Sequence, residues 1–140
     1  MAASLWFEMH GATVHFPLAL TVCAAMCDAG GLFAGGRPAA RSLHGAARWS
    51  ILLGAGVSVL AVASGLLLTH GTMLGKDLVL RHHAMVWPAF ALLVGVATWR
   101  LFVGERPRGP AMLACTLVEV VAAALMIGAG YWGGQMLGVA

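Results

Sequence analysis

The sequence predicts an all-α integral membrane protein, a four-helix bundle of up-down-up-down topology with both termini on the non-cytoplasmic side. Of its 140 residues, 61% are hydrophobic and only 9% are charged, whereas about a quarter of the residues in a soluble domain are charged. Four apolar runs reach the roughly 20 residues that cross a bilayer. The length suits one domain, residues 1–140, and its apolar surface exceeds what so short a chain can bury, so the lipid bilayer is the expected partner for the rest.

Each apolar run holds at most one charged residue. The expected helices cover residues 11–33, 49–69, 84–103 and 110–132. The first run contains Asp28, the second has no charge, the third has Arg100 in its last turn, and the fourth contains Glu119. Helices are expected because a backbone in lipid must satisfy its own hydrogen bonds. A charge within a span is costly unless it is paired, so we expect Arg100 to pair with Asp28 or Glu119 in preference to forming a proton path.

Short connections separate the runs and set their orientation. They are rich in glycine, proline and charge, as turns are, and their shortness predicts antiparallel neighbours. The first and third connections, with the adjacent helix ends, hold six of the eight basic residues: Arg37, Arg41, Arg48, Arg100, Arg106 and Arg108. Basic residues favour the cytoplasmic side. The expected location is therefore the bacterial inner (cytoplasmic) membrane, multi-pass, with the second connection in the periplasm.

Other features of the sequence exclude a nucleic-acid-binding protein and a cleaved signal peptide, and they suggest a role for the cysteines. The basic residues are scattered along the span ends and do not form the patch that nucleic acid requires, so no nucleic-acid partner is expected. The three cysteines, Cys23, Cys27 and Cys115, lie in apolar runs and are interpreted as small buried apolar residues. The N-terminus lacks the basic residues that open a secretory signal peptide, so the first run is expected to be retained.

The histidines gather at one predicted face of the membrane. Five of the six lie at the expected periplasmic ends of the helices: His10, His15, His70, His82 and His83. The sixth, His44, lies in the basic first connection and is interpreted as a polar loop residue. Five residues turn a helix by about 140°, so His10 and His15 cannot face the same partner. We expect His15, the deeper of the two, to face the bundle interior, because an imidazole that faces lipid is costly.

Imidazoles on two facing helices are a usual way to hold a b-type haem. His15 and His83, at similar depth on the first and third helices, are the expected axial ligands of haem b. The remaining outer residues are expected as substitute ligands or as donors that orient a ligand or a propionate: His10, His70, His82 and Arg81. Small residues are expected to leave room for the macrocycle: Ala61, Ser64, Gly65 and Gly95.

Two other interpretations of the histidines stay open. A copper or zinc site is favoured by the imidazoles and by Met9, Met73 and Met85 near the same face. No Met-x-x-Met or His-x-His spacing accompanies them. Alternatively, the histidines cap helix ends and bind headgroups or water.

The stretch His10-Gly-Ala-Thr-Val-His15-Phe-Pro17, followed by Asp28, resembles the start of a bacterial membrane family catalogued as domain of unknown function 2231. Members of that family typically begin with His-Pro and then His-Phe-Pro, and here Gly11 replaces the first proline. Further similar segments are Ala63-Ser-Gly-Leu66, Arg81-His-His-Ala84 and Gly133-Gly134, although the tail lacks the His-Gly often found there. The resemblance implies a four-helix architecture, similar to that of four-helix b-type cytochromes, and no established reaction.

The sequence therefore suggests a membrane-embedded b-type cytochrome or redox subunit that passes electrons between quinol and a periplasmic redox partner, with catalytic chemistry left to partner proteins. A stand-alone enzyme is not expected. One alternative is a cofactor-free anchoring or assembly subunit of a larger respiratory or photosynthetic complex, with Gly54-Ala-Gly56 and Gly128-Ala-Gly130 as contact faces. Another is the copper or zinc protein described above. Metal transport is not favoured, because the histidines lie on one side and the second run has no charge.

Overall fold

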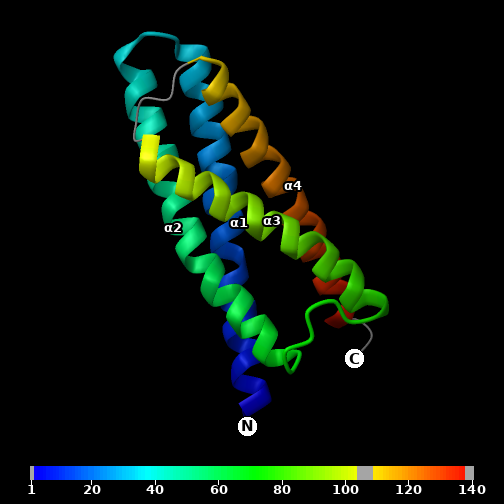
Figure 1. The fold of residues 1–140 in the computed structure, drawn as a ribbon. Helices are drawn as coiled ribbons and strands as arrows, with labels where there is room; N and C mark the ends of the chain where they lie inside the picture. Colours follow the sequence, from blue (N-terminus) through cyan, green and yellow to red (C-terminus); the bar gives the residue numbers. More distant parts are fainter. Residues whose placement is uncertain (1, 104–108, 138–140) are drawn as a thin grey trace.

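The computed structural model describes residues 2–103 and 109–137, and all the secondary structure in this part of the chain is helical. The four helices are α1 (Ala2–Ala34), α2 (Pro38–Leu68), α3 (Asp77–Val103) and α4 (Pro110–Leu137). They run alternately up and down, so the start of α1 lies at the same end of the bundle as the ends of α2 and α4 (Figure 1). The predicted all-α class with four membrane-spanning helices is confirmed.

Local sequence explains where the helices begin and end. Gly35 has a φ of +63° directly after α1, a conformation that glycine adopts without steric cost. Pro38 then opens α2, because the first helical turn needs no donor from the residue at that position. At the other end of α2, the backbone N–H of Gly71 donates to the carbonyl oxygen of Leu66 at 2.7 Å, and the φ of Gly71 is +79°.

The helices are longer than the apolar runs. α1 begins at Ala2 and not at residue 11, α2 at Pro38 and not at residue 49, and α3 at Asp77 and not at residue 84. These three helices have 33, 31 and 27 residues and therefore span about 40–50 Å, compared with about 30 Å for the hydrocarbon core of a bilayer. The polar ends of these helices therefore extend into the headgroup regions, where a polar side chain costs little free energy.

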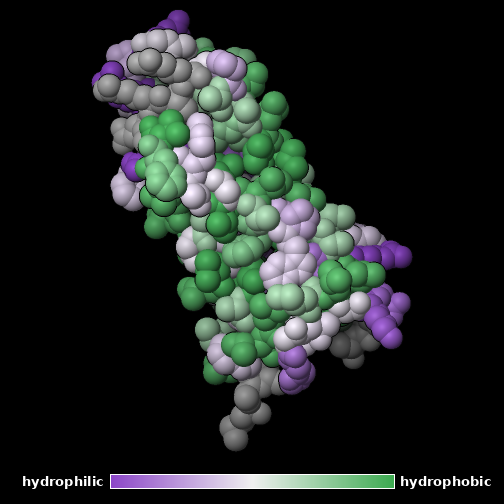
Figure 2. Space-filling model, in the orientation of Figure 1, coloured by the Kyte–Doolittle hydropathy of each residue, from purple (hydrophilic) through white to green (hydrophobic). Residues whose placement is uncertain are grey.

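All four helices are long and apolar enough to cross a membrane. Large hydrophobic side chains point outward, among them Phe33 and Phe102, which are 91% and 86% exposed. Figure 2 shows hydrophobic side chains over the middle of the visible face, with hydrophilic ones mainly toward its ends. This distribution fits a surface covered by lipid. The chain is accordingly a multi-pass membrane protein.

Small side chains fill the inside of the bundle. Most of the buried hydrophobic residues are alanines, among them Ala24 and Ala47, and the larger Ile51 and Leu93 are fully buried beside them. The helices that pack together most extensively are α1 with α2 and α3 with α4, and α1 also packs against α4. Small residues let membrane helices approach each other closely. The close packing fixes the side chains that reach across from one helix to another.

Candidate functional site: two polar clusters in an apolar bundle

Three imidazoles meet at the end of the bundle that contains the N-terminus. The rings of His10 on α1 and His82 on α3 have centroids 6.5 Å apart, at an interplanar angle of 76°. The ring of His83 lies 5.6 Å from that of His82, and it also contacts the indole of Trp87 at 6.3 Å. We call His10, His82 and His83 the histidine cluster. It joins α1 to α3, two helices that are not neighbours along the chain.

Backbone carbonyls hold two of these rings in place. The Nδ1 of His10 lies 2.9 Å from the carbonyl oxygen of Ala61 on α2, and the Nδ1 of His82 lies 2.8 Å from that of Ala129 on α4. A carbonyl oxygen can only accept, so both Nδ1 atoms carry the proton and donate it. In a neutral imidazole the lone pair then lies on Nε2. Both rings are thus fixed in the tautomer that leaves Nε2 open to a metal.

Glycine leaves the space that His10 occupies. A Cβ added at Gly65 would lie 2.9 Å from Cε1 of His10, closer than real contacts allow. The ring therefore packs directly on the backbone of α2, beside Ser64, whose Oγ lies 3.3 Å from the His10 Nδ1. Against α4, a Cβ at Gly133 would lie 3.5 Å from the His82 ring, an ordinary contact. His83 is buried, and its Nδ1 has no hydrogen-bond partner among the described residues.

The prediction that His15 faces the interior is wrong. His15 is exposed on the outside of α1, and no described residue forms a hydrogen bond, ion pair or ring contact with it. The structure thus brings His10, and not His15, to His82 and His83. The reason is the position of each residue around the axis of α1. The buried side of this helix includes Pro17 and Asp28, and His10 lies on that side. The ligand role expected for the His15 and His83 pair stays a prediction, although His15 is exposed on α1 and His83 is buried on α3.

Two more of the expected residues lie outside the histidine cluster. His70 follows α2 and is exposed, with a φ of +51°. Arg81 is exposed, and its guanidinium carbon lies 4.7 Å from the centroid of the Trp132 ring, a cation–π contact between α3 and α4. Both residues are at the same end of the bundle as the cluster, without contact to its rings in the described part of the chain.

A second polar cluster lies toward the opposite end of the bundle, and it contains at least one side chain from each of the four helices. We call it the charged cluster: Asp28, His44, Arg100, Cys115 and Glu119. The Nη2 atom of Arg100 forms an ion pair with Oδ2 of Asp28, and it lies 3.8 Å from Oε1 of Glu119. All three of these side chains are fully buried. The predicted pairing of Arg100 with a buried acid is therefore confirmed.

The interpretation of His44 as a polar loop residue is wrong. It lies within α2, and its Nδ1 is 2.8 Å from Oδ1 of Asp28. Gly31 on α1 makes room for this ring, since a Cβ there would lie 2.5 Å from its Cε1. His44 thus lies over Asp28 on the side away from Arg100, and the acid is held between a histidine and a guanidinium.

The cysteines differ from the expectation in part. Cys115 is buried as predicted, and its Sγ lies 3.5 Å from Oε1 of Glu119, to which it donates. Cys27 is partly buried and packs against the main core cluster, so the prediction holds for it in part. Cys23 is exposed, and its prediction as a buried residue is wrong, because it lies on the outside of α1.

A carboxylate-rich cluster raises the question of a cation site. One ligand atom from each of Asp28, Cys115 and Glu119 lies within 4.8 Å of the others. However, the Arg100 guanidinium is already between the two acids and neutralises one of them. A metal ion would have to displace that charge in a low-dielectric interior, where repulsion between like charges is strong. The Arg100 charge therefore makes the charged cluster poorly suited to a metal ion.

Comparison with known protein families shows to which family the chain belongs. The model of a family described as "Predicted membrane protein (DUF2231)" matches residues 7–139. The chain belongs to this family. The match confirms the family resemblance seen in the sequence, and it supports the membrane assignment. No curated protein and no solved structure matches the chain.

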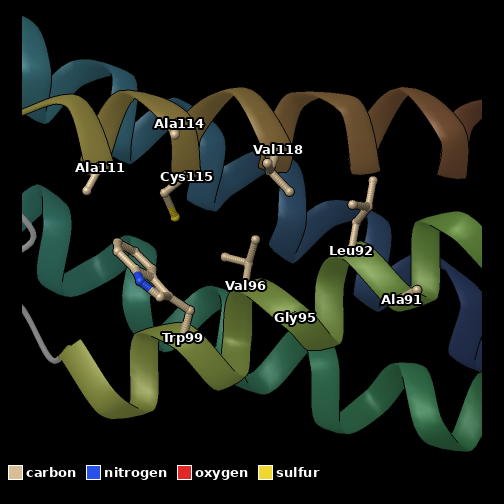
Figure 3. Close-up of a pocket in the computed structure, with 9 residues that line it drawn as sticks. All are labelled: Ala91, Leu92, Gly95, Val96, Trp99, Ala111, Ala114, Cys115 and Val118. Carbon is tan, nitrogen blue, oxygen red and sulfur yellow. The ribbon is translucent and has the colours of Figure 1, made fainter.

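This DUF2231 member also has an apolar groove on its outside, between α3 and α4 (Figure 3). Its volume is about 360 Å³, and its walls include Gly95, Val96 and Trp99 from α3 and Cys115 and Val118 from α4. Gly95, which was expected to leave room for a haem, opens onto this groove and not onto the histidines. Figure 3 shows Cys115 directed toward α3, so one thiol adjoins both the groove and Glu119.

Proposed function

We propose that this DUF2231 member is a transition-metal-binding membrane protein, and that the histidine cluster holds a zinc or copper ion. The observation that carries the proposal is the pair of Nδ1 hydrogen bonds from His10 and His82 to backbone carbonyls. A metal-binding histidine almost always donates its other ring N–H to such an acceptor, which fixes the tautomer and raises the basicity of the ligand nitrogen. Imidazole suits both zinc and copper.

His83 distinguishes this proposal from a purely structural role. Hydrogen bonds between helices account for His10 and His82 as polar links across an apolar bundle. They do not account for His83, which is buried beside the other two rings with an unpartnered Nδ1. Buried polar atoms are nearly always hydrogen-bonded, so an exception calls for an explanation. An ion bound to His83 would supply the missing partner. One nitrogen from each of these three described rings does not yet lie within 4.8 Å of the others, so the rings would have to move toward each other to share one ion.

A b-type haem was the first hypothesis from the sequence, and the residues present do not fit it well. The macrocycle was expected to pass the backbone of α2 at Gly65, but the His10 ring fills that space. The expected axial pair also has His15 on the outside of α1. A single ion requires only the nitrogen lone pairs, whereas a haem requires an open slot between two rings. We therefore derive no step through a haem.

The proposed ion would lie close to one end of the bundle, the end predicted to face the periplasm. A copper ion there could exchange single electrons with a redox protein at that surface or with quinol in the bilayer, as a redox subunit of a larger membrane complex would. A zinc ion would instead fix α1 to α3. The identity of the bound metal separates these two forms of the proposal, since zinc has no redox chemistry.

Metal titration of the purified chain tests the proposal. The protein in detergent would be stripped with a chelator and titrated with Zn²⁺ and with Cu⁺, and optical spectra and iron analysis would accompany the titration. We expect one ion per chain, and a loss of affinity on the order of 100-fold or more in His82→Ala. His15→Ala is the matched control, since this exposed side chain forms no hydrogen bond, ion pair or ring contact with a described residue, and the metal affinity of this variant should equal that of the natural chain.

Three results would overturn the proposal. One is the absence of tight binding of either metal. Another is an equal loss of affinity in His15→Ala and His82→Ala. The last is bound iron with the optical bands of a b-type haem, which would restore the haem hypothesis instead.

A further inference from the structure

The charged cluster contains an unbalanced charge. Asp28, Arg100 and Glu119 are each 0% exposed, so water does not reach them in the folded bundle. Two carboxylates face a single guanidinium, which leaves one negative charge uncompensated if both acids are ionised. A net charge buried in a membrane-spanning bundle is expensive, and a buried group commonly takes up or loses a proton to avoid it.

Two groups in the cluster can take a compensating proton. His44 lies 2.8 Å from Asp28 through Nδ1, and its other ring nitrogen can be protonated. Its side chain is 15% exposed, so it is the member of the cluster that reaches the surface of the bundle. Glu119 is the second group. Its Oε2 has no hydrogen-bond partner among the described residues, and its Oε1 lies 3.8 Å from Arg100, too far for a hydrogen bond.

Asp28 is a poor third site for the proton. One of its oxygens accepts a hydrogen bond from His44, and the other forms the ion pair with Arg100, so each oxygen faces a group that favours the ionised carboxylate. Hydrogen bonds to the charged form of a carboxylate favour that form. Glu119 has weaker contacts with its cationic neighbour and one donor, the Cys115 thiol. The proton therefore has one site near the surface and one deep in the bundle, with Asp28 and Arg100 between them.

We propose that the charged cluster binds one exchangeable proton, which His44 and Glu119 share. The groups that face this proton are Asp28 from α1, His44 from α2, Arg100 from α3, and Cys115 and Glu119 from α4. Arg48 of α2 also approaches, but it is partly exposed, and its Nε lies 3.4 Å from the main-chain carbonyl oxygen of Arg100.

The position of the cluster gives the proton a route to the surface. His44 lies near the start of α2 and its side chain is 15% exposed, so the proton can exchange there. On the other side of the cluster, Glu119 accepts from Cys115, which lines the apolar groove between α3 and α4 (Figure 3). This inference is independent of the metal proposal, because the two clusters share no residue.

Infrared spectroscopy of the protein at neutral pH tests the inference, combined with NMR of histidine labelled with ¹⁵N. The chain has only five Asp and Glu residues, which simplifies the assignment of a protonated carboxyl band. In the natural chain, the protonated Glu119 carboxyl and the His44 imidazolium should together amount to one proton per chain. In His44→Gln, the whole proton should move to Glu119. In Glu119→Gln, Asp28 and Arg100 balance each other, so the proton should leave the cluster and His44 should be neutral.

Asp28→Asn is the decisive variant. It removes one negative charge, so Arg100 and Glu119 then balance each other, and the extra proton should leave although both of its sites are intact. Glu8→Gln, which changes an exposed acid on α1, is the control and should leave the signals unchanged. A carboxyl band that persists in Asp28→Asn would overturn the inference, because burial alone would then explain it. If that variant does not fold, an ionised Glu119 in His44→Gln would overturn it equally.

Discussion

Replacing Gly65 with alanine is expected to remove metal binding while it leaves the fold almost unchanged. The added Cβ would lie 2.9 Å from Cε1 and 3.2 Å from Nδ1 of His10. Because these atoms belong to a side chain that can rotate, the ring should swing away and the backbone should keep its place. The hydrogen bond from His10 to the carbonyl oxygen of Ala61 would then be lost.

The structure allows the cost of this change to be estimated. The lost hydrogen bond contributes about 0.5–1.5 kcal/mol in water, and about 0.6 kcal/mol on average between membrane helices. The Ala61 carbonyl keeps a donor, because the Ser64 Oγ lies 2.9 Å from it. Alanine favours a helix over glycine by up to about 1 kcal/mol. The free energy of unfolding should therefore change by less than about 1 kcal/mol.

Metal affinity should respond much more strongly. Loss of the group that orients a ligand typically lowers the affinity about 10–100-fold, and here the ligand itself also moves. Gly56→Ala is the matched control on the same helix, because its added Cβ meets nothing within 4 Å. Thermal unfolding in detergent and competition with a chelator measure the two quantities. The reasoning is refuted if both variants bind the metal as the natural chain does, or if Gly65→Ala unfolds the bundle.

Two further predictions concern the charged cluster. Arg100→Gln leaves the two buried carboxylates without their cation, and breaking such a pair typically costs about 3–5 kcal/mol. Denaturant unfolding in micelles should detect the loss, and a change below 1 kcal/mol would show that the ion pair with Asp28 adds little. Gly31→Ala should push His44 off Asp28, since the new Cβ would lie 2.5 Å from the ring, and should destabilise the fold by about 1–3 kcal/mol. The neighbouring Gly30→Ala, with its nearest contact at 3.4 Å, should change stability by no more than about 0.5 kcal/mol, and equal effects of the two would contradict the assigned position of His44.

The membrane helices and the ion pair could be predicted because lipid leaves few alternatives. An apolar run of about 20 residues has to be a spanning helix. A charge inside such a run has to find a partner, which predicted the pairing of Arg100. Both predictions rest on the cost of exposing polar groups to hydrocarbon. That cost is large enough to decide the structure before any detail of packing is known.

The choice between His10 and His15 failed because it depends on rotational phase. The prediction used depth alone, which favoured His15. A signal was nevertheless present, since Asp28 is 18 residues after His10 and thus five full turns of 3.6 residues along the same face. His15 is 13 residues before Asp28 and therefore on another face. The buried acid could have served as a reference for the interior side of α1.

His44 was missed for a different reason. The expected second helix began at residue 49, where the uncharged run starts, so His44 was assigned to a loop. In the structure α2 begins at Pro38, and a proline in the first turn after a glycine pair is a recognisable start of a helix. The contact with Asp28 is specified by the packing of α1 on α2, including the close approach at Gly31. That packing could not be derived from the pattern of one sequence.

X-ray absorption spectroscopy of the metal-loaded protein tests the central claim most directly. A zinc or copper ion in the histidine cluster should show a first shell of imidazole nitrogens at about 2.0–2.1 Å. The signal of at least one imidazole should be lost in His82→Ala and retained in His15→Ala. A sulfur ligand at about 2.3 Å that is lost in a variant without cysteines would assign the ion to the cysteines instead. That result, or a chain that holds no stoichiometric zinc or copper after loading, would contradict the account.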